Sequence, residues 1–125
     1  MTELATQSAA SSERSSGARQ PNILLIMADQ LSAPFLSIYG GPAITPNIDR
    51  LAAQGTTFTS AYSNSPLCAP ARFAMMSGQL NSRIGAYDNA SEFASSIPTF
   101  AHHLRSAGYQ TSLVGKMHFV GADQL

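Results

Sequence analysis

Cys68 and Arg72 stand four residues apart, with Pro70 between them. Proline suits the first turn of a helix, where its missing N–H costs nothing, and residues 71–76 are mostly good helix formers. Cys68 is therefore expected at a helix N-terminus, where free N–H groups and the helix dipole favour an anion. Arg72 would lie on the same helix face, so its guanidinium could hold a negative group beside the cysteine. Because a lone cysteine is more often a small buried hydrophobe, this interpretation depends on the rest of the chain.

Two other parts of the chain carry side chains that could take part in catalysis or binding. Lys116 and His118 follow the β-rich segment 110–114, and residues two apart on an extended chain share one face. Asp29 comes just after the apolar run 22–27, and ligands collect beyond the carboxyl ends of strands in α/β sheets. Alone, such an aspartate is usually a turn residue, and a lysine beside a packed histidine is equally ordinary. Both sites gain weight only from the Cys-Pro-Arg motif.

The elements that must position these residues alternate between strands and helices. The expected strands are residues 22–27, 56–62 and 110–114. The expected helices are one capped by Thr45 that runs from Pro46 to Ala53 and closes at Gly55, one that begins at Cys68, and one that opens at Ile97–Thr99 and ends before Gly108. A loop is expected from Gly78 to Ser96. This order predicts an α/β fold around a mostly parallel sheet.

Composition narrows the function classes. The chain has 125 residues, zero net charge and 11% charged residues, with no basic cluster, so nucleic-acid binding is not expected. It contains one cysteine, which excludes an internal disulfide, and no apolar run that predicts a membrane span. Residues 1–20 are rich in Ser and Ala without a signal-peptide core, so we expect a disordered leader and a cytoplasmic protein.

The segment from Asn64 to Gly78, which surrounds Cys68, resembles the signature of the sulfatases. The resemblance implies that Cys68 is oxidised to Cα-formylglycine, the catalytic nucleophile, by a formylglycine-generating or an anaerobic sulfatase-maturating enzyme. Position 71 is Ala where many family members carry Ser. We expect this departure to tune recognition by the modifying enzyme without abolishing the motif.

The resemblance also implies roles for the other site residues. Arg72 would hold the hydrated aldehyde, Lys116 would bind a sulfate oxygen, and His118 would contact the formylglycine hydroxyls and help move their proton. Asp29 and Gln30, together with residue 68, would ligate a divalent cation. Calcium is the first expectation, with Mg²⁺ or Mn²⁺ as alternatives, because these hard ions accept carboxylate and carbonyl oxygens. Most sulfatases carry two adjacent acids where this chain has Asp-Gln, which leaves the identity of the metal open.

The sulfatase fold is an alkaline-phosphatase-like sandwich several times longer than this chain. Residues 21–125 are therefore expected to be the N-terminal portion of a catalytic domain whose remaining metal ligands lie downstream. Alone, the 125-residue piece is expected to show no turnover, and its uncovered apolar strands predict poor solubility.

Within the family, residues 21–125 most resemble the choline-sulfatase branch. The resemblance is carried by Met27–Leu31, Asn64–Cys68, Gly85–Asn89, Phe93, Ile97–His102 and Gly115–Gly121. It implies a small sulfate ester, choline-O-sulfate, as substrate and leaves a homo-oligomer possible. A quaternary ammonium is held by aromatic faces and acids, and the sequence does not assign that pocket to Tyr87, Phe93 or Phe119.

Two alternatives stay open. One is a related hydrolase that uses the same nucleophile on aryl sulfates or phosphonate monoesters, and the other is a short noncatalytic protein. The neighbouring His102 and His103 point in different directions on a helix, so we interpret them as structural.

Overall fold

The computed structural model describes residues 20–119. Its elements, in chain order, are η1 (Ala33–Phe35), η2 (Ser37–Tyr39), α1 (Pro46–Gln54), α2 (Cys68–Ser77), α3 (Asn81–Ile84) and α4 (Phe100–Ser106). The predicted leader at residues 1–20 lies almost wholly outside this range. No helix in residues 20–119 is long and apolar enough to cross a membrane.

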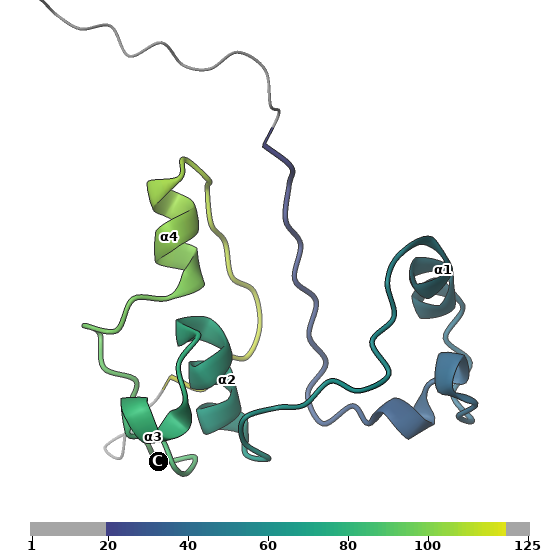
Figure 1. The fold of residues 1–125 in the computed structure, drawn as a ribbon, viewed down its shortest axis with the longest axis horizontal. Coiled ribbons are helices and arrows are strands. Elements are labelled where there is room, and N and C mark those ends of the chain that lie inside the picture. The colour runs from purple at the N-terminus through teal and green to yellow at the C-terminus, as the bar shows by residue number, and fades with distance from the viewer. Residues whose placement is uncertain (1–19, 120–125) are drawn as a thin grey trace, which may run out of the picture.

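The helices form two groups (Figure 1). In one, α1 packs on η2, which contacts η1, and in the other α2 contacts both α3 and α4. Extended chain after α1 joins the groups. The buried core belongs to the second group, where Ala69, Phe73 and Ala86 are fully buried and Ile84 and Phe93 pack against them.

The three long helices confirm the sequence prediction because their ends are locally specified. Helix α1 begins at Pro46 after Thr45 and ends before Gly55. In α2, Pro70 stands in the first turn as expected, and Gly78 ends the helix in the left-handed region with φ 66°. Helix α4 follows Thr99 and stops at Ser106, two residues before Gly108. The loop prediction for residues 78–96 was incomplete, because the short α3 lies within it.

In the group around α1, two hydroxyl groups form a hydrogen-bond cluster with one carboxylate. Ser37 Oγ donates to both oxygens of Asp49 at 2.7 and 2.8 Å, and it lies 2.6 Å from Thr45 Oγ1. Thr45 Oγ1 also donates to Asp49 at 3.2 Å. Asp49 lies in the first turn of α1, so this hydrogen-bond cluster stabilises the start of the helix. It also connects η2 to α1, because Ser37 belongs to η2.

The predicted strands are not confirmed, because the structure shows no β-strand in residues 20–119. Residues 22–27, 56–62 and 110–114 run as extended, unpaired chain, and one isolated parallel bridge joins Leu36 and Ala43. A strand exists only when its N–H and C=O groups meet a neighbouring strand, and none of these segments meets one here. Segments 22–27 and 110–114 instead border a common groove of about 430 Å³ that also reaches α2 and α4.

Candidate active site

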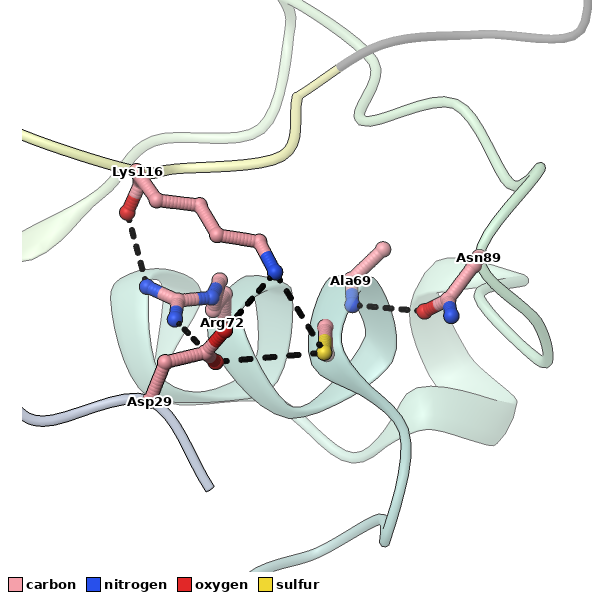
Figure 2. A network of polar contacts seen from close by, with 6 residues as sticks. Asp29, Ala69, Arg72, Asn89 and Lys116 are labelled. Carbon is pink, nitrogen blue, oxygen red and sulfur yellow. Dashed lines mark hydrogen bonds and ion pairs between the residues drawn. The ribbon is translucent and has the colours of Figure 1, made fainter. Parts of the chain in front are cut away.

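The site is built on the first turn of α2. Cys68 is the first residue of this helix, and its free thiol is partly exposed. The next backbone N–H, that of Ala69, donates to Asn89 Oδ1 at 3.0 Å, as Figure 2 shows. Proline at position 70 contributes no N–H, so the first hydrogen bond of the helix runs from Ala71 N to Leu67 O at 3.1 Å. The sequence prediction of a cysteine at a helix N-terminus is confirmed.

Arg72 lies one helical turn beyond Cys68 and is 6% exposed. Its Nη2 donates to Asp29 Oδ1 at 2.9 Å, and its Nη1 donates to the carbonyl oxygen of Lys116 at 2.7 Å. The planar guanidinium therefore holds two chain segments at once, which a lysine ammonium could not do with the same geometry. Arg72 Nε is buried and has no hydrogen-bond partner in the described part of the chain.

Asp29 and Lys116 complete a charged cluster around the thiol (Figure 2). Lys116 Nζ lies 2.9 Å from Asp29 Oδ2 and 3.7 Å from Cys68 Sγ. The thiol also lies 3.9 Å from Asp29 Oδ1. These residues follow the two extended segments that were predicted as strands, and α2 brings them together. The structure thus gathers four predicted site residues, Asp29, Cys68, Arg72 and Lys116, into one network.

The charges in this network stabilise one another. The hydrogen bond from Lys116, followed by that from Arg72, holds the pKa of Asp29 below the usual value of an aspartate. The same hydrogen bond to Asp29 raises the pKa of Lys116 above 10.5. Both side chains therefore carry their charges at neutral pH. With two cations against one carboxylate, the surroundings of Cys68 favour a bound anion.

The structure does not bring Gln30 and His118 into this network, although Gln30 follows Asp29 and His118 lies two residues after Lys116. Both have positive φ angles, 56° for Gln30 and 59° for His118, a conformation that residues other than glycine rarely adopt. His118 Nδ1 is buried without a hydrogen-bond partner among residues 20–119. Strained backbone and buried polar atoms without partners cluster at functional sites, and the role of His118 stays a prediction.

The predicted cation site is not completed by these residues. Ca²⁺ takes six to eight oxygen ligands, and Mg²⁺ takes six. Here Asp29 already pairs with two cations, and no group of three or more His, Cys, Asp or Glu side chains occurs in residues 20–119. Gln30 would add one amide oxygen. The donor set of the described chain therefore does not fit a divalent cation by itself.

His102, Tyr87, Phe93 and Phe119 make contacts away from the charged network. His102 Nδ1 accepts a hydrogen bond from the Thr99 N–H at 3.1 Å, so this side chain closes the start of α4. Tyr87 is 66% exposed, and its hydroxyl donates to Ser82 O at 3.4 Å. Phe93 and Phe119 pack on Phe73 of α2. None of these rings forms an open cage for a quaternary ammonium in the structure.

Sequence reasoning missed Asn89. It lies in the turn after α3, where the backbone N–H of Ala90 and the Ser91 hydroxyl donate to Asp88 Oδ1, each at 3.0 Å. Such Asx turns are readable from sequence as loop signals. Nothing in the local spacing shows that the neighbouring asparagine reaches α2, because that contact joins residues 20 positions apart.

Known proteins resemble this chain over most of its length. The model of the sulfatase family matches residues 21–124. The chain is 57% identical over 109 residues to a choline-sulfatase from Rhizobium meliloti, covering 85% of this chain and 21% of that protein. It is 38% identical to an N-acetylglucosamine-6-O-sulfatase from Bacteroides thetaiotaomicron, over 85% of this chain and 19% of that protein. Bovine arylsulfatase A is 44% identical over 81% of this chain and 21% of its own length.

The chain thus spans about a fifth of the length of the curated relatives that it matches. The match includes every residue of the charged network around Cys68, and it extends over both chain segments that Arg72 holds. The chain belongs to the sulfatase family, which implies an alkaline-phosphatase-like fold for the whole protein.

Proposed function

We propose that the whole protein is a sulfuric ester hydrolase that cleaves choline-O-sulfate to choline and sulfate. The observation that carries this proposal is the convergence of Asp29, Arg72 and Lys116 on Cys68 at the start of α2. A cationic pocket at a helix N-terminus suits a sulfate group, whose three outer oxygens must be neutralised before sulfur can be attacked. The identity with the choline-sulfatase supports the choice of substrate.

The nucleophile would be a formylglycine made from Cys68 by a maturation enzyme. In the structure residue 68 carries an unmodified thiol, and its Sγ marks the position that the hydroxyls of the hydrated aldehyde would occupy. The hydrate supplies two hydroxyls on one carbon, one to attack sulfur and expel the alcohol and one whose deprotonation releases sulfate and restores the aldehyde. A serine could perform only the first half.

The surrounding residues would then act as follows. Arg72 fixes the position of the attacking group, because its own position is set by two hydrogen bonds. Lys116 would bind a sulfate oxygen, which the 3.7 Å distance from its Nζ to the sulfur of Cys68 supports. His118, two residues after Lys116 in the chain, would accept the proton of the second hydroxyl.

Four further predictions belong to the whole protein. Divalent-cation binding by Asp29, Gln30 and residue 68 would need additional donors from outside residues 20–119. We also propose that segments 22–27 and 110–114 join a mostly parallel sheet of the alkaline-phosphatase-like fold. A cytoplasmic location and a homo-oligomer remain predictions.

Sulfate release from choline-O-sulfate by the whole protein, purified from a host with a maturation enzyme, tests the function. We expect turnover that Cys68→Ala lowers by about a thousandfold or more. Mass spectrometry of the peptide around residue 68 should show the mass of formylglycine. Active enzyme with only unmodified cysteine would overturn the mechanism, and the 125-residue piece alone should show no turnover.

A second candidate is hydrolysis of aryl sulfates or phosphonate monoesters. The 44% identity with bovine arylsulfatase A supports it. Comparing kcat/KM for choline-O-sulfate with that for p-nitrophenyl sulfate and a p-nitrophenyl phosphonate separates the candidates. A higher value for a p-nitrophenyl substrate would favour the second candidate.

A further inference from the structure

Three phenylalanine rings from separate parts of the chain pack together behind the site. Phe73 of α2 stacks on Phe93 with ring centroids 4.7 Å apart and planes 16° apart. Phe119 packs against both, at 5.6 Å from Phe73 and 5.1 Å from Phe93. These separations are typical of favourable aromatic pairs. Phe73 is fully buried, and Phe119 is 41% exposed.

Phe119 follows directly after His118, the predicted proton acceptor. On the other side of His118, the carbonyl oxygen of Lys116 is held by Arg72 at 2.7 Å. Arg72 and Phe73 are consecutive residues of α2, so one turn of this helix holds the segment 116–119 at two points. One contact is polar and lies before His118, and the other is aromatic and lies after it.

Between these two contacts the backbone of His118 adopts a left-handed conformation, with φ 59°. Such a conformation costs energy in any residue but glycine and persists only when its surroundings determine it. The imidazole Nδ1 is buried and has no hydrogen-bond partner in residues 20–119, so no hydrogen bond at this atom fixes the ring. The ring is therefore positioned mainly through its backbone.

We propose that Phe119 is a positioning residue that fixes the place of the His118 imidazole, because it anchors the adjacent backbone to Phe73 and Phe93. This inference rests on the proposed function for the role of His118 in turnover, but not for its placement. It also gives the aromatic cluster a role other than cation binding, because the three rings pack on one another.

Kinetics of the whole protein test the proposal. Phe119→Ala should lower kcat for sulfate release by about 10- to 100-fold with KM changed by less than about threefold, since a misplaced catalytic group costs rate rather than affinity. Phe119→Tyr, which keeps the ring, should restore kcat to within about threefold of the wild type. Phe58→Ala removes a 71% exposed ring outside the cluster and should leave kcat unchanged.

A double-mutant cycle separates positioning from a general loss of structure. If Phe119 acts through His118, Phe119→Ala should cost less than about twofold in kcat when His118 is already alanine. Losses that multiply independently in the double variant would overturn the proposal. Equal losses in Phe119→Ala and Phe119→Tyr would also overturn it.

Nuclear magnetic resonance of histidine labelled at Cε1 gives a readout that does not need turnover. The signal absent from His118→Ala identifies His118, and it should shift in Phe119→Ala but not in Phe58→Ala. A shift in a protein that releases no sulfate would support the positioning while the proposed function fails. Turnover with an unmoved signal would leave the function standing and overturn the positioning.

Discussion

Helix α2 and the segment 22–27 are both rich in apolar residues, yet they have opposite surroundings in residues 20–119. In α2, Ala69 and Phe73 are fully buried, and even Arg72 is only 6% exposed. In the segment, Leu24 is 83% exposed and Ile26 is 78% exposed. Hydrophobic composition alone therefore does not decide which part of this chain is buried.

The difference comes from how each element satisfies its backbone. A helix makes its hydrogen bonds within itself, so α2 can form wherever its ends are specified and one face is covered. A strand needs a neighbour at every other residue, and the segment 22–27 has none in the described chain. Four site residues nevertheless meet, because Arg72 reaches from α2 to the ends of both extended segments.

Among the tests of this difference between α2 and the segment 22–27, Phe73→Ala is expected to have the largest effect on stability. Removing a fully buried ring from the centre of the α2 core should lower the free energy of unfolding of the whole protein by about 3–5 kcal/mol. Urea unfolding measures it. Phe58→Ala, at a 71% exposed ring, should stay within about 0.5 kcal/mol of the wild type. Equal losses in the two variants would mean that the core is not centred on α2.

Leu24→Asp tests whether the extended segment becomes a buried strand in the whole protein. If the segment joins the proposed sheet, a carboxylate at this position would be buried without a partner and should cost about 3 kcal/mol in urea unfolding. Ile44→Asp, at a loop position that is 92% exposed, is the matched control. A Leu24→Asp variant as stable as its control would refute the sheet proposal for this segment.

Arg72→Lys should weaken the junction between the two regions. A lysine cannot donate to both Asp29 and the Lys116 carbonyl from a planar fork, so we expect a loss of about 1–3 kcal/mol in stability and a fall in sulfate release. The exposed Arg105→Lys on α4 serves as the control and should change neither quantity. Unchanged sulfate release in Arg72→Lys would contradict the positioning of the site by this guanidinium.

The smallest expected effect is the pH dependence of stability that comes from the ion pairs of Asp29. The pKa of Asp29 is lowered below 3.8, so its ion pairs contribute stability above that pH and lose it as the pH falls through the lowered pKa. The pKa of Lys116 is raised above 10.5, so its contribution is present below 10.5 and is lost as the pH rises through the raised value. The stability difference between wild type and Lys116→Met should therefore be constant from about pH 5 to 9 and shrink outside this window.

Carboxyl NMR checks the cause directly. Lys116→Met removes the main hydrogen bond that lowers the pKa of Asp29, so this pKa should move up toward 3.8. Because both side chains are substantially exposed, the effect on unfolding should be small and should decrease with added salt. An Asp29 pKa that does not move would show that Arg72 alone sets it.

Part of the site could be predicted because its signals are local. Pro70 and the residues after it specify a helix that starts at Cys68, and Gly78 specifies its end. Local sequence signals could not predict the pairing of Asp29 with Lys116, since these residues stand 87 positions apart. The predicted strands are not confirmed in residues 20–119 for a similar reason, because the sequence pattern indicates an extended chain but does not supply its partner strand.

The sequence by itself determined the three long helices, the position of the cysteine and the identity of the charged side chains, because caps, glycines and prolines act over a few residues. Only the tertiary structure decided that Arg72 holds Asp29 and the Lys116 carbonyl together, that Asn89 reaches Ala69, and that Phe119 packs on Phe73. Each of these contacts joins residues 20 or more positions apart. Their energies depend on packing and burial that exist only once the chain has folded.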